Sequence, residues 1–300
     1  MLAGLLLIAA CDTVEPGGGE QLVIEAFVEA ERKLPAVRLW RTRPLELSYT
    51  FGASTAVEDA EVMLRVGPES FPYRPLAGRP GWYEPARSDA PAVPGRTPVR
   101  LEASWGARHA TAESVVPPPL RLDSVRVRVP ERPVDGIILD SLFFDPARLD
   151  SLQFDSLKTG AAKGLVYLVE VTLHWTVDFE EAGADSAYWI RTQLRPDLPT
   201  RPVFEDFFFR PEQVFRERDA RRADARRRVW TGVYAVPVGG VDEPLPPHPL
   251  RVALLRSRQD YARYVASRRD PERREPASNV AGGLGIVAGI SLDTLRVPVH

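Results

Sequence analysis

The residue best suited to carry chemistry is Cys11, the single cysteine in this 300-residue chain. It closes an apolar run at residues 5–10, and residues 8–11 read Ile-Ala-Ala-Cys. This pattern is typical of a bacterial lipoprotein signal, in which the thiol is acylated and the cysteine becomes the first residue of the mature chain. The sequence therefore predicts lipidation at Cys11 and attachment to the cell envelope.

A buried strand or helix is the alternative interpretation of residues 1–10, but such segments rarely stand at an extreme N-terminus. The run is also much shorter than the ~20 residues that span a bilayer. No Lys or Arg precedes Cys11, so we expect the true start to lie upstream of Met1 and to add a basic region. Residues 12–20 are acidic and rich in Gly, as in a flexible tether.

Regular spacing of carboxylates raises the hypothesis of a calcium site, because hard cations bind clustered oxygens. The residues concerned are Asp140, Asp145, Asp150 and Asp155. They lack the spacing that places several ligands within one tight loop, which favours turn and strand-edge roles. The histidines are scattered and form no metal-binding pair: His109, His174, His248 and His300. We therefore expect neither a metal nor a cofactor.

No catalytic motif is recognisable in the chain. A Gly-x-Ser-x-Gly nucleophile elbow is absent, and Cys11 is committed to lipid. The Gly-Gly-Leu-Gly segment at residues 282–285 lacks the ending of a phosphate-binding loop and is more typical of a turn with positive φ. A hydrolase that uses Asp178 and Glu180 is the least favoured hypothesis, and we expect no catalytic residues.

Residues 212–228 carry seven Arg among four acidic residues, a local balance of +3. The segment lacks interleaved aromatic residues, so nucleic-acid binding is not expected. A solvated helix or mobile arm is favoured over contact with lipid A phosphates or an acidic partner, although the role of Arg216–Arg228 stays open. Nearby aromatic residues favour a core position over an interface: Phe204, Phe207, Phe208, Phe209 and Phe215.

Composition describes an ordinary globular chain, with 27% charged and 44% hydrophobic residues. The net charge of −2 argues against broad electrostatic binding of nucleic acid or anionic lipid. A mature length near 290 residues exceeds one typical domain of ~100–150 residues. We therefore expect two domains, at residues 21–116 and 120–300, and we expect residues 1–20 to be the signal peptide and tether.

Residues 21–116 alternate apolar and polar side chains in several short stretches separated by Pro and Gly, which predicts a β-sandwich. Strands are expected at residues 22–28, 37–42, 62–66 and 99–105. Three consecutive prolines at residues 117–119 then form a linker that cannot continue a sheet.

Residues 120–300 predict a second β-rich domain with one or two short helices. Its strongest strand is 167–177, with residues 188–194 as the expected hairpin partner. Further strands are expected at 229–238, 250–255 and 286–299. A helix capped by Ser257 is expected to contain Tyr261 and Tyr264 and to stop before Pro271.

The chain resembles the domain of unknown function 4249 family, envelope lipoproteins of Bacteroidota-type bacteria. The resemblance rests on the lipobox, the opening strand, Gly81-Trp82-Tyr83, Tyr261, and residues 60–64, 116–117, 122–125 and 275–285. The order of these pieces, and above all the Ser-Asn-Val-x-Gly-Gly-x-Gly tail, carries the match. The resemblance implies that the first domain is a sandwich like those of immunoglobulins or carboxypeptidase-regulatory domains. It also implies that the gene lies beside genes for TonB-dependent receptors. The family has no established catalytic residues that could be assigned to this chain.

The expected protein is therefore mainly β and non-enzymatic, an outer-membrane lipoprotein that faces the periplasm or the cell surface. Its membrane contact is the N-terminal lipid, and an outer-membrane receptor of the TonB-dependent kind is the candidate protein partner. A structural or adhesive surface lipoprotein is the alternative function.

Overall fold

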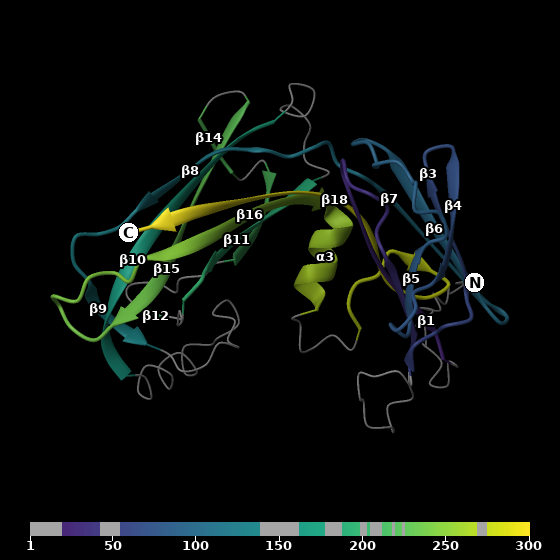
Figure 1. Cartoon of the computed structure of the whole chain (residues 1–300), viewed down its shortest axis with the longest axis horizontal. Coiled ribbons are helices and arrows are strands. Elements are labelled where there is room, and N and C mark those ends of the chain that lie inside the picture. The colour runs from purple at the N-terminus through teal and green to yellow at the C-terminus, as the bar shows by residue number, and fades with distance from the viewer. Residues whose placement is uncertain are drawn as a thin grey trace, which may run out of the picture.

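Two β-rich halves lie next to each other, and the long strand β18 (Leu284–Val299) runs through both (Figure 1). The computed structural model describes residues 20–42, 55–138, 162–177, 188–198, 203–204, 212–217, 220–223, 226–268 and 275–300. These residues form one 12-stranded sheet, one smaller sheet and one helix. The predicted mainly β fold is confirmed.

The N-terminal half consists of two sheet layers around one core. Its own strands are β1 (Leu22–Glu29), β2 (Val37–Arg41), β3 (Glu61–Val66), β4 (Glu69–Pro75), β5 (Trp82–Pro85), β6 (Pro98–Trp105) and β7 (Arg108–Val115). The sheet order is β18-β1-β2-β5-β4-β3-β6-β7-β17, where β17 is Val280–Ala281. The strands predicted in this half are confirmed, with small shifts at their ends.

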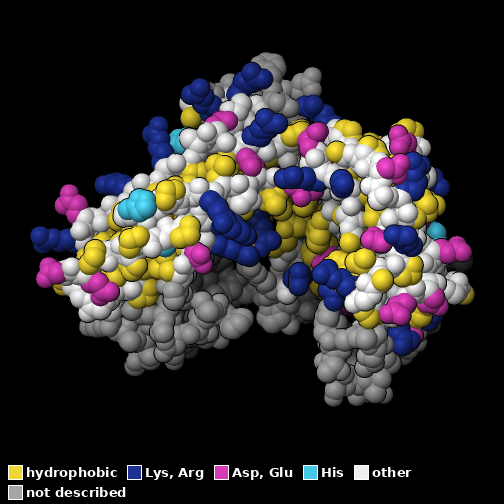
Figure 2. Space-filling model, in the orientation of Figure 1, with side chains coloured by type: hydrophobic (Ala, Val, Ile, Leu, Met, Phe, Trp, Pro, Cys, Tyr) yellow, Lys and Arg dark blue, Asp and Glu magenta, His cyan; other side chains and the backbone are white. Residues whose placement is uncertain are grey.

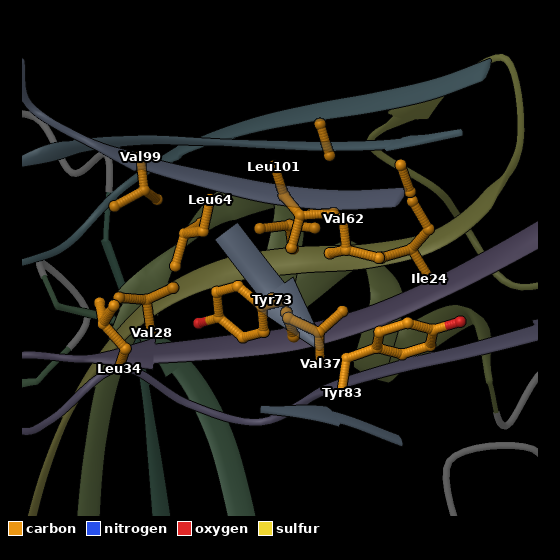
Figure 3. Packing of buried hydrophobic residues seen from close by; sticks show 14 of the residues in the cluster. Ile24, Val28, Leu34, Val37, Val62, Leu64, Tyr73, Tyr83, Val99 and Leu101 are labelled. Atoms are coloured by element: carbon orange, nitrogen blue, oxygen red, sulfur yellow. The ribbon is translucent and has the colours of Figure 1, made fainter. Parts of the chain in front are cut away.

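Alternation of side chains explains how these strands build the core. Ile24 and Val37 point from one layer toward Val62, Leu64 and Leu101 of the other (Figure 3), and all five are buried. Burying each such side chain contributes roughly 1.5–3 kcal/mol. The identification of this sandwich as immunoglobulin-like or carboxypeptidase-regulatory-like stays a prediction.

The C-terminal half is also two layers deep. One layer is the end of the large sheet, in the order β13-β11-β16-β18, with β11 (Tyr188–Pro196), β13 (Glu212–Arg216) and β16 (His248–Arg258). The other is the small sheet of β8 (Leu122–Arg128), β9 (Val134–Ile138), β10 (Ala162–Thr176), β12 (Val203–Phe204), β14 (Arg221–Arg222) and β15 (Arg227–Val238). Trp175, Leu173 and Tyr234 pack between the layers against Leu250 and Leu254.

Strand β10 confirms the strongest sequence pattern, because its apolar face from Tyr167 to Val177 is buried. The predicted hairpin with residues 188–194 is wrong. β10 pairs with β15 on one edge and with β8 and β9 on the other, whereas β11 pairs with β13 and β16 in the large sheet. Alternation identified both strands correctly but carries no information about which strands pair.

Helix α3 (Gln259–Ser267) confirms the predicted helix, with Tyr261 and Tyr264 buried. Its N-cap is Arg258, so the prediction that Ser257 caps it is wrong. Ser257 is still part of β16, and its hydroxyl donates to the Gly289 carbonyl oxygen at 2.7 Å. The helix starts one residue later because Ser257 pairs with Ile290 in the sheet.

Strand β18 changes its partner at Ile290. Residues 284–290 pair in parallel with β1, and residues 290–299 pair antiparallel with β16. Val280 and Val287 consequently belong to the N-terminal core, although they come from the last part of the chain. The predicted boundary between residues 116 and 120 stays a prediction, and the C-terminal strand contributes to both halves. No helix in the described ranges has the length and hydrophobicity of a transmembrane span.

Candidate functional site

The tail motif that carried the family resemblance packs against the N-terminal half, just before β18 continues into the C-terminal half. The Asn279 amide nitrogen donates to the carbonyl oxygens of Val287 at 2.8 Å and Glu113 at 3.2 Å. The Val287 N–H donates back to the Asn279 Oδ1 at 3.0 Å. One side chain thus pairs with β18 as a neighbouring strand would, and it also reaches the end of β7.

The glycines of the tail permit close contact between backbones. Gly282 and Gly285 have φ of +76° and +109°, which confirms the prediction of positive-φ positions. A Cβ atom on Gly285 would collide with the Ile24 carbonyl oxygen of β1. A Cβ on Gly283 would lie 2.5 Å from the Leu22 carbonyl oxygen. These positions therefore require glycine to let the tail lie flat against β1.

Side chains from both halves hold β18 at its crossing point. The Gly289 N–H donates to the Ser114 hydroxyl of β7 at 2.9 Å, and the Gly289 carbonyl accepts from Ser257 of β16. Beyond the crossing, the Leu120 N–H donates to the Ser291 hydroxyl at 2.7 Å. Each bond contributes about 0.5–1.5 kcal/mol, so the crossing is defined by several independent contacts.

Two tyrosines of α3 connect the halves. Arg191 of β11 donates to the Tyr261 hydroxyl at 3.0 Å, and the Tyr261 ring packs edge-on against Phe27 of β1. The Tyr264 hydroxyl donates to the Glu25 carboxylate at 3.1 Å. Burial, with a smaller contribution from the Glu25 charge, raises the pKa of Tyr264 to about 12. The phenol is therefore neutral and remains a donor at neutral pH.

An aromatic surface continues from this contact across the outer face of β2 and β5. The Arg38 guanidinium lies 4.7 Å from the Trp40 ring centre and 5.6 Å from that of Trp82. It also lies 3.9 Å from the Glu25 carboxylate. Both tryptophans are half-buried. Arg38 is therefore held in place by cation–π contacts and by charge.

A groove of about 450 Å³ lies between the end of β7 and the start of α3. Its walls carry charges of both signs and several apolar surfaces, with Arg65, Gly67, Pro98, Val99, Arg100, Glu113, Ser114, Val115, Arg258 and Asp260 as the lining residues. Two of these residues pair with each other, because Arg100 contacts Glu113 at 3.0 Å. The groove can hold a polar chain segment, and its lining carries three arginines and two acidic residues.

Several predicted site residues lie outside the described residues: Cys11, Asp140, Asp145, Asp150, Asp155, Asp178, Glu180, Phe207, Phe208 and Phe209. Across the described ranges, no group of three or more His, Cys, Asp or Glu is arranged to hold a metal ion. His248 is buried, with Tyr234 and the Pro246 carbonyl oxygen each 2.6 Å from a ring nitrogen. His109 is exposed beside Ser104, at 3.0 Å.

The prediction for the Arg-rich segment was a solvated helix or a mobile arm, and the helix form is wrong where the structure describes the segment. β13 and β14 lie within it, and β15 begins in it. Arg216 lies over Trp189 at 5.1 Å, and Arg228 is buried. The buried Glu217 pairs with Arg256 of β16 at 2.9 Å. The described parts of the segment form strands because their partners lie in β11 and β15, which the charge pattern does not reveal.

Sequence reasoning missed the residues that connect the halves. Alternation in β2 places Arg38 and Trp40 on one face, which was a usable signal. The contact with Trp82 and the connection through Tyr264 depend on strand register and helix position. Ser114 and Ser257 carry no local signal, since a serine in a strand has many ordinary roles.

Fold and junction together define a class of mainly β proteins in which one C-terminal strand joins two sandwiches. A family model described as a domain of unknown function (DUF4249) matches residues 12–296. The chain belongs to this family, as the sequence resemblance predicted. No curated protein and no solved structure matches the chain.

Proposed function

We propose that the protein is a lipid-anchored component of the cell envelope that acts as a non-enzymatic binding or accessory subunit. The observation that carries the proposal is the position of Cys11. The family match begins at residue 12, directly after the lipobox cysteine. Lipid on Cys11 would therefore stand immediately before the matched range, and the Gly-rich tether at residues 12–20 would join it to the first strand.

The junction supports a binding role over a catalytic one. β18, α3 and the side chains around Gly289 connect the two halves through many contacts, so both sandwiches present their outer faces in one fixed arrangement. A preorganised surface binds a partner at a lower entropic cost than a mobile one. We assign no catalytic residue, and we propose an outer-membrane receptor of the TonB-dependent kind as the partner.

A structural or adhesive surface protein is the second candidate. The continuity of β18 favours it, because two sandwiches sharing a strand form a stiff spacer. Deletion separates the two roles: an accessory subunit is required for uptake through its receptor, whereas an adhesive protein is required for attachment with uptake unchanged. Co-purification of a receptor from detergent-solubilised envelope supports the first role, and a preparation free of such a receptor contradicts it.

Replacement of Cys11 tests the anchor directly. Cys11→Ser should abolish incorporation of a labelled fatty acid and release the protein from the membrane fraction. Thr13→Ala, two residues further along the tether, is the matched control and should stay membrane-bound. If the Cys11→Ser protein still fractionates with the membrane, the proposal of a lipid anchor at Cys11 is wrong.

A further inference from the structure

Three arginines form a row across the outer face of the C-terminal half. Arg195 of β11 lies directly opposite Arg251 of β16, and Arg251 lies directly opposite Arg296 of β18. Facing side chains on antiparallel strands have Cβ atoms about 4.5–5.5 Å apart. The three guanidinium groups therefore start from neighbouring positions on three adjacent strands.

All three side chains are exposed, and none makes an ion pair with a carboxylate of the described residues. Two acidic residues share this face, Asp197 just after β11 and Glu212 of β13, which pairs with Gln193. Like charges that face each other across strands destabilise a sheet. Folding alone therefore gives no reason for this row, and an external anion would supply the missing charge.

The row lies on the same sheet face that α3 packs against. The helix packs on β11, β16 and β18 from this same side, through contacts with Arg191 and Leu255. Between the helix and the row, β11, β16 and β18 carry Gln193, Ala253 and Thr294 on this face, all of them uncharged, and Glu212 of β13 pairs with Gln193 at the same level. Figure 2 shows basic side chains gathered on this half of the molecule, next to hydrophobic side chains.

We propose that this arginine row binds an extended acidic segment of a partner protein, with carboxylates at alternate positions. Strands lie ~4.8 Å apart, so the outer two arginines begin ~10 Å from each other. Alternate side chains of an extended chain lie ~6.7 Å apart on one side. Two or three carboxylates laid across the strands thus come within reach of all three long arginine side chains.

Arginine suits this role because its planar guanidinium can hold a carboxylate with two parallel hydrogen bonds. A flat anionic membrane fits less well. The helix stands on the sheet face that carries the row, and a helix with its side chains is ~10 Å across. A narrow peptide can enter beside it. This inference rests on the proposed accessory role and specifies the chemistry of the partner's contact.

Binding of a synthetic peptide tests the proposal. The probe is a fluorescein-labelled peptide with three glutamates alternating with threonines, titrated with the full chain carrying Cys11→Ser so that lipid plays no part. The triple variant R195Q/R251Q/R296Q should bind about tenfold more weakly, as three ion pairs of ~0.5 kcal/mol predict. Added salt should weaken wild-type binding, because exposed charges are screened.

A matched control removes three other exposed arginines, on β8 and just before it: R121Q/R126Q/R128Q. It changes the net charge equally and should bind the peptide as the parent does. Equal losses in both triple variants, or no binding by the parent, overturn the proposal. Phosphatidylglycerol vesicles form the second arm, and row-dependent binding to vesicles without binding to the peptide also overturns it.

The folding of the variants is checked by thermal unfolding, where the row variant should be at least as stable as the parent because repulsion is removed. The outcome is independent of the anchor, since the chain tested carries no lipid. If the peptide does not bind, the arginine-row proposal fails, and the lipid anchor is still tested separately by the membrane fractionation of Cys11→Ser.

Discussion

The outer faces of the two halves differ in whether their arginines have acidic partners across neighbouring strands. In the N-terminal half, Arg38 faces Glu25, Arg74 faces Glu84, and Arg100 faces Glu113 across neighbouring strands. Arg65 and Arg100 also face each other, and both contact Glu102, at 3.7 and 2.8 Å. In the C-terminal half, the facing residues Arg195, Arg251 and Arg296 have no acidic partner.

The difference shows which charges serve the fold and which remain open to a ligand. Cross-strand pairs of opposite charge contribute roughly 0.2–1 kcal/mol each, and like pairs cost a similar amount. The N-terminal face is therefore compensated within the chain. The C-terminal face keeps a small electrostatic penalty, which is the kind of feature that binding sites retain.

The largest expected effect concerns the strand that the two halves share. Gly285→Ala introduces a Cβ that collides with the Ile24 carbonyl oxygen at a φ of +109°. We expect a loss of at least ~4 kcal/mol in the free energy of unfolding, or failure to fold. Urea unfolding measures it, with Gly240→Ala as control, since a Cβ at Gly240 meets nothing within 4 Å. A stable Gly285→Ala protein would contradict the described contact between β18 and β1.

A smaller loss is expected at the buried ion pair of the C-terminal half. Glu217→Gln removes the negative charge that pairs with the buried Arg256 guanidinium, which costs about 3 kcal/mol. The matched change in the N-terminal half is Glu84→Gln, which breaks the exposed pair with Arg74 and should cost less than ~1 kcal/mol. Equal losses of unfolding free energy in the two variants would show that the buried pair matters no more than the exposed one.

High pH should weaken the helix contact between the halves. The pKa of Tyr264 is about 12 in the folded chain against 10.0 for an ordinary tyrosine. The unfolded chain therefore releases the proton first, and stability falls as pH rises from 10 to about 12. Unfolding free energies measured from pH 8 to 12 should fall less steeply in Tyr264→Phe. A slope remains because burial also raises the pKa of Tyr73 and Tyr234.

The smallest expected effect has opposite signs in the two halves. Arg251→Gln removes repulsion within the row and should raise the unfolding free energy by about 0.2–1 kcal/mol. Arg100→Gln removes two ion pairs in the N-terminal half and should lower it by a similar amount. Thermal or urea unfolding at low salt measures both. The same sign for both variants would show that the row is not electrostatically strained.

Much of the fold was predictable because alternation is a local property. Strands such as β6 and β10 bury every second side chain, and each inward position is visible in the sequence. Helix α3 was predicted in the same way, from Tyr261 and Tyr264. The prediction of positive φ in the tail was also correct, because glycine is the residue that tolerates it.

Pairing was not predictable, and the errors follow from that. Residues 188–194 form a strand as expected but lie in the other sheet, and Ser257 pairs with Ile290 where a helix cap was expected. Charges near Arg216 favoured a solvated helix or a mobile arm, yet partners in β11 and β15 make the described parts of that segment strands. In each case a contact between distant residues outweighed a local preference.

The sequence by itself determined the mainly β class, the inward faces of the strands, the family, and the prediction of a lipid at Cys11. These depend on residue types and their spacing along the chain. Only the tertiary structure decided that β18 joins both halves, that Asn279 and Ser114 hold it there, and that Arg195, Arg251 and Arg296 form one row. Register between strands sets those neighbours, and register results from packing of the whole sheet rather than from any single segment.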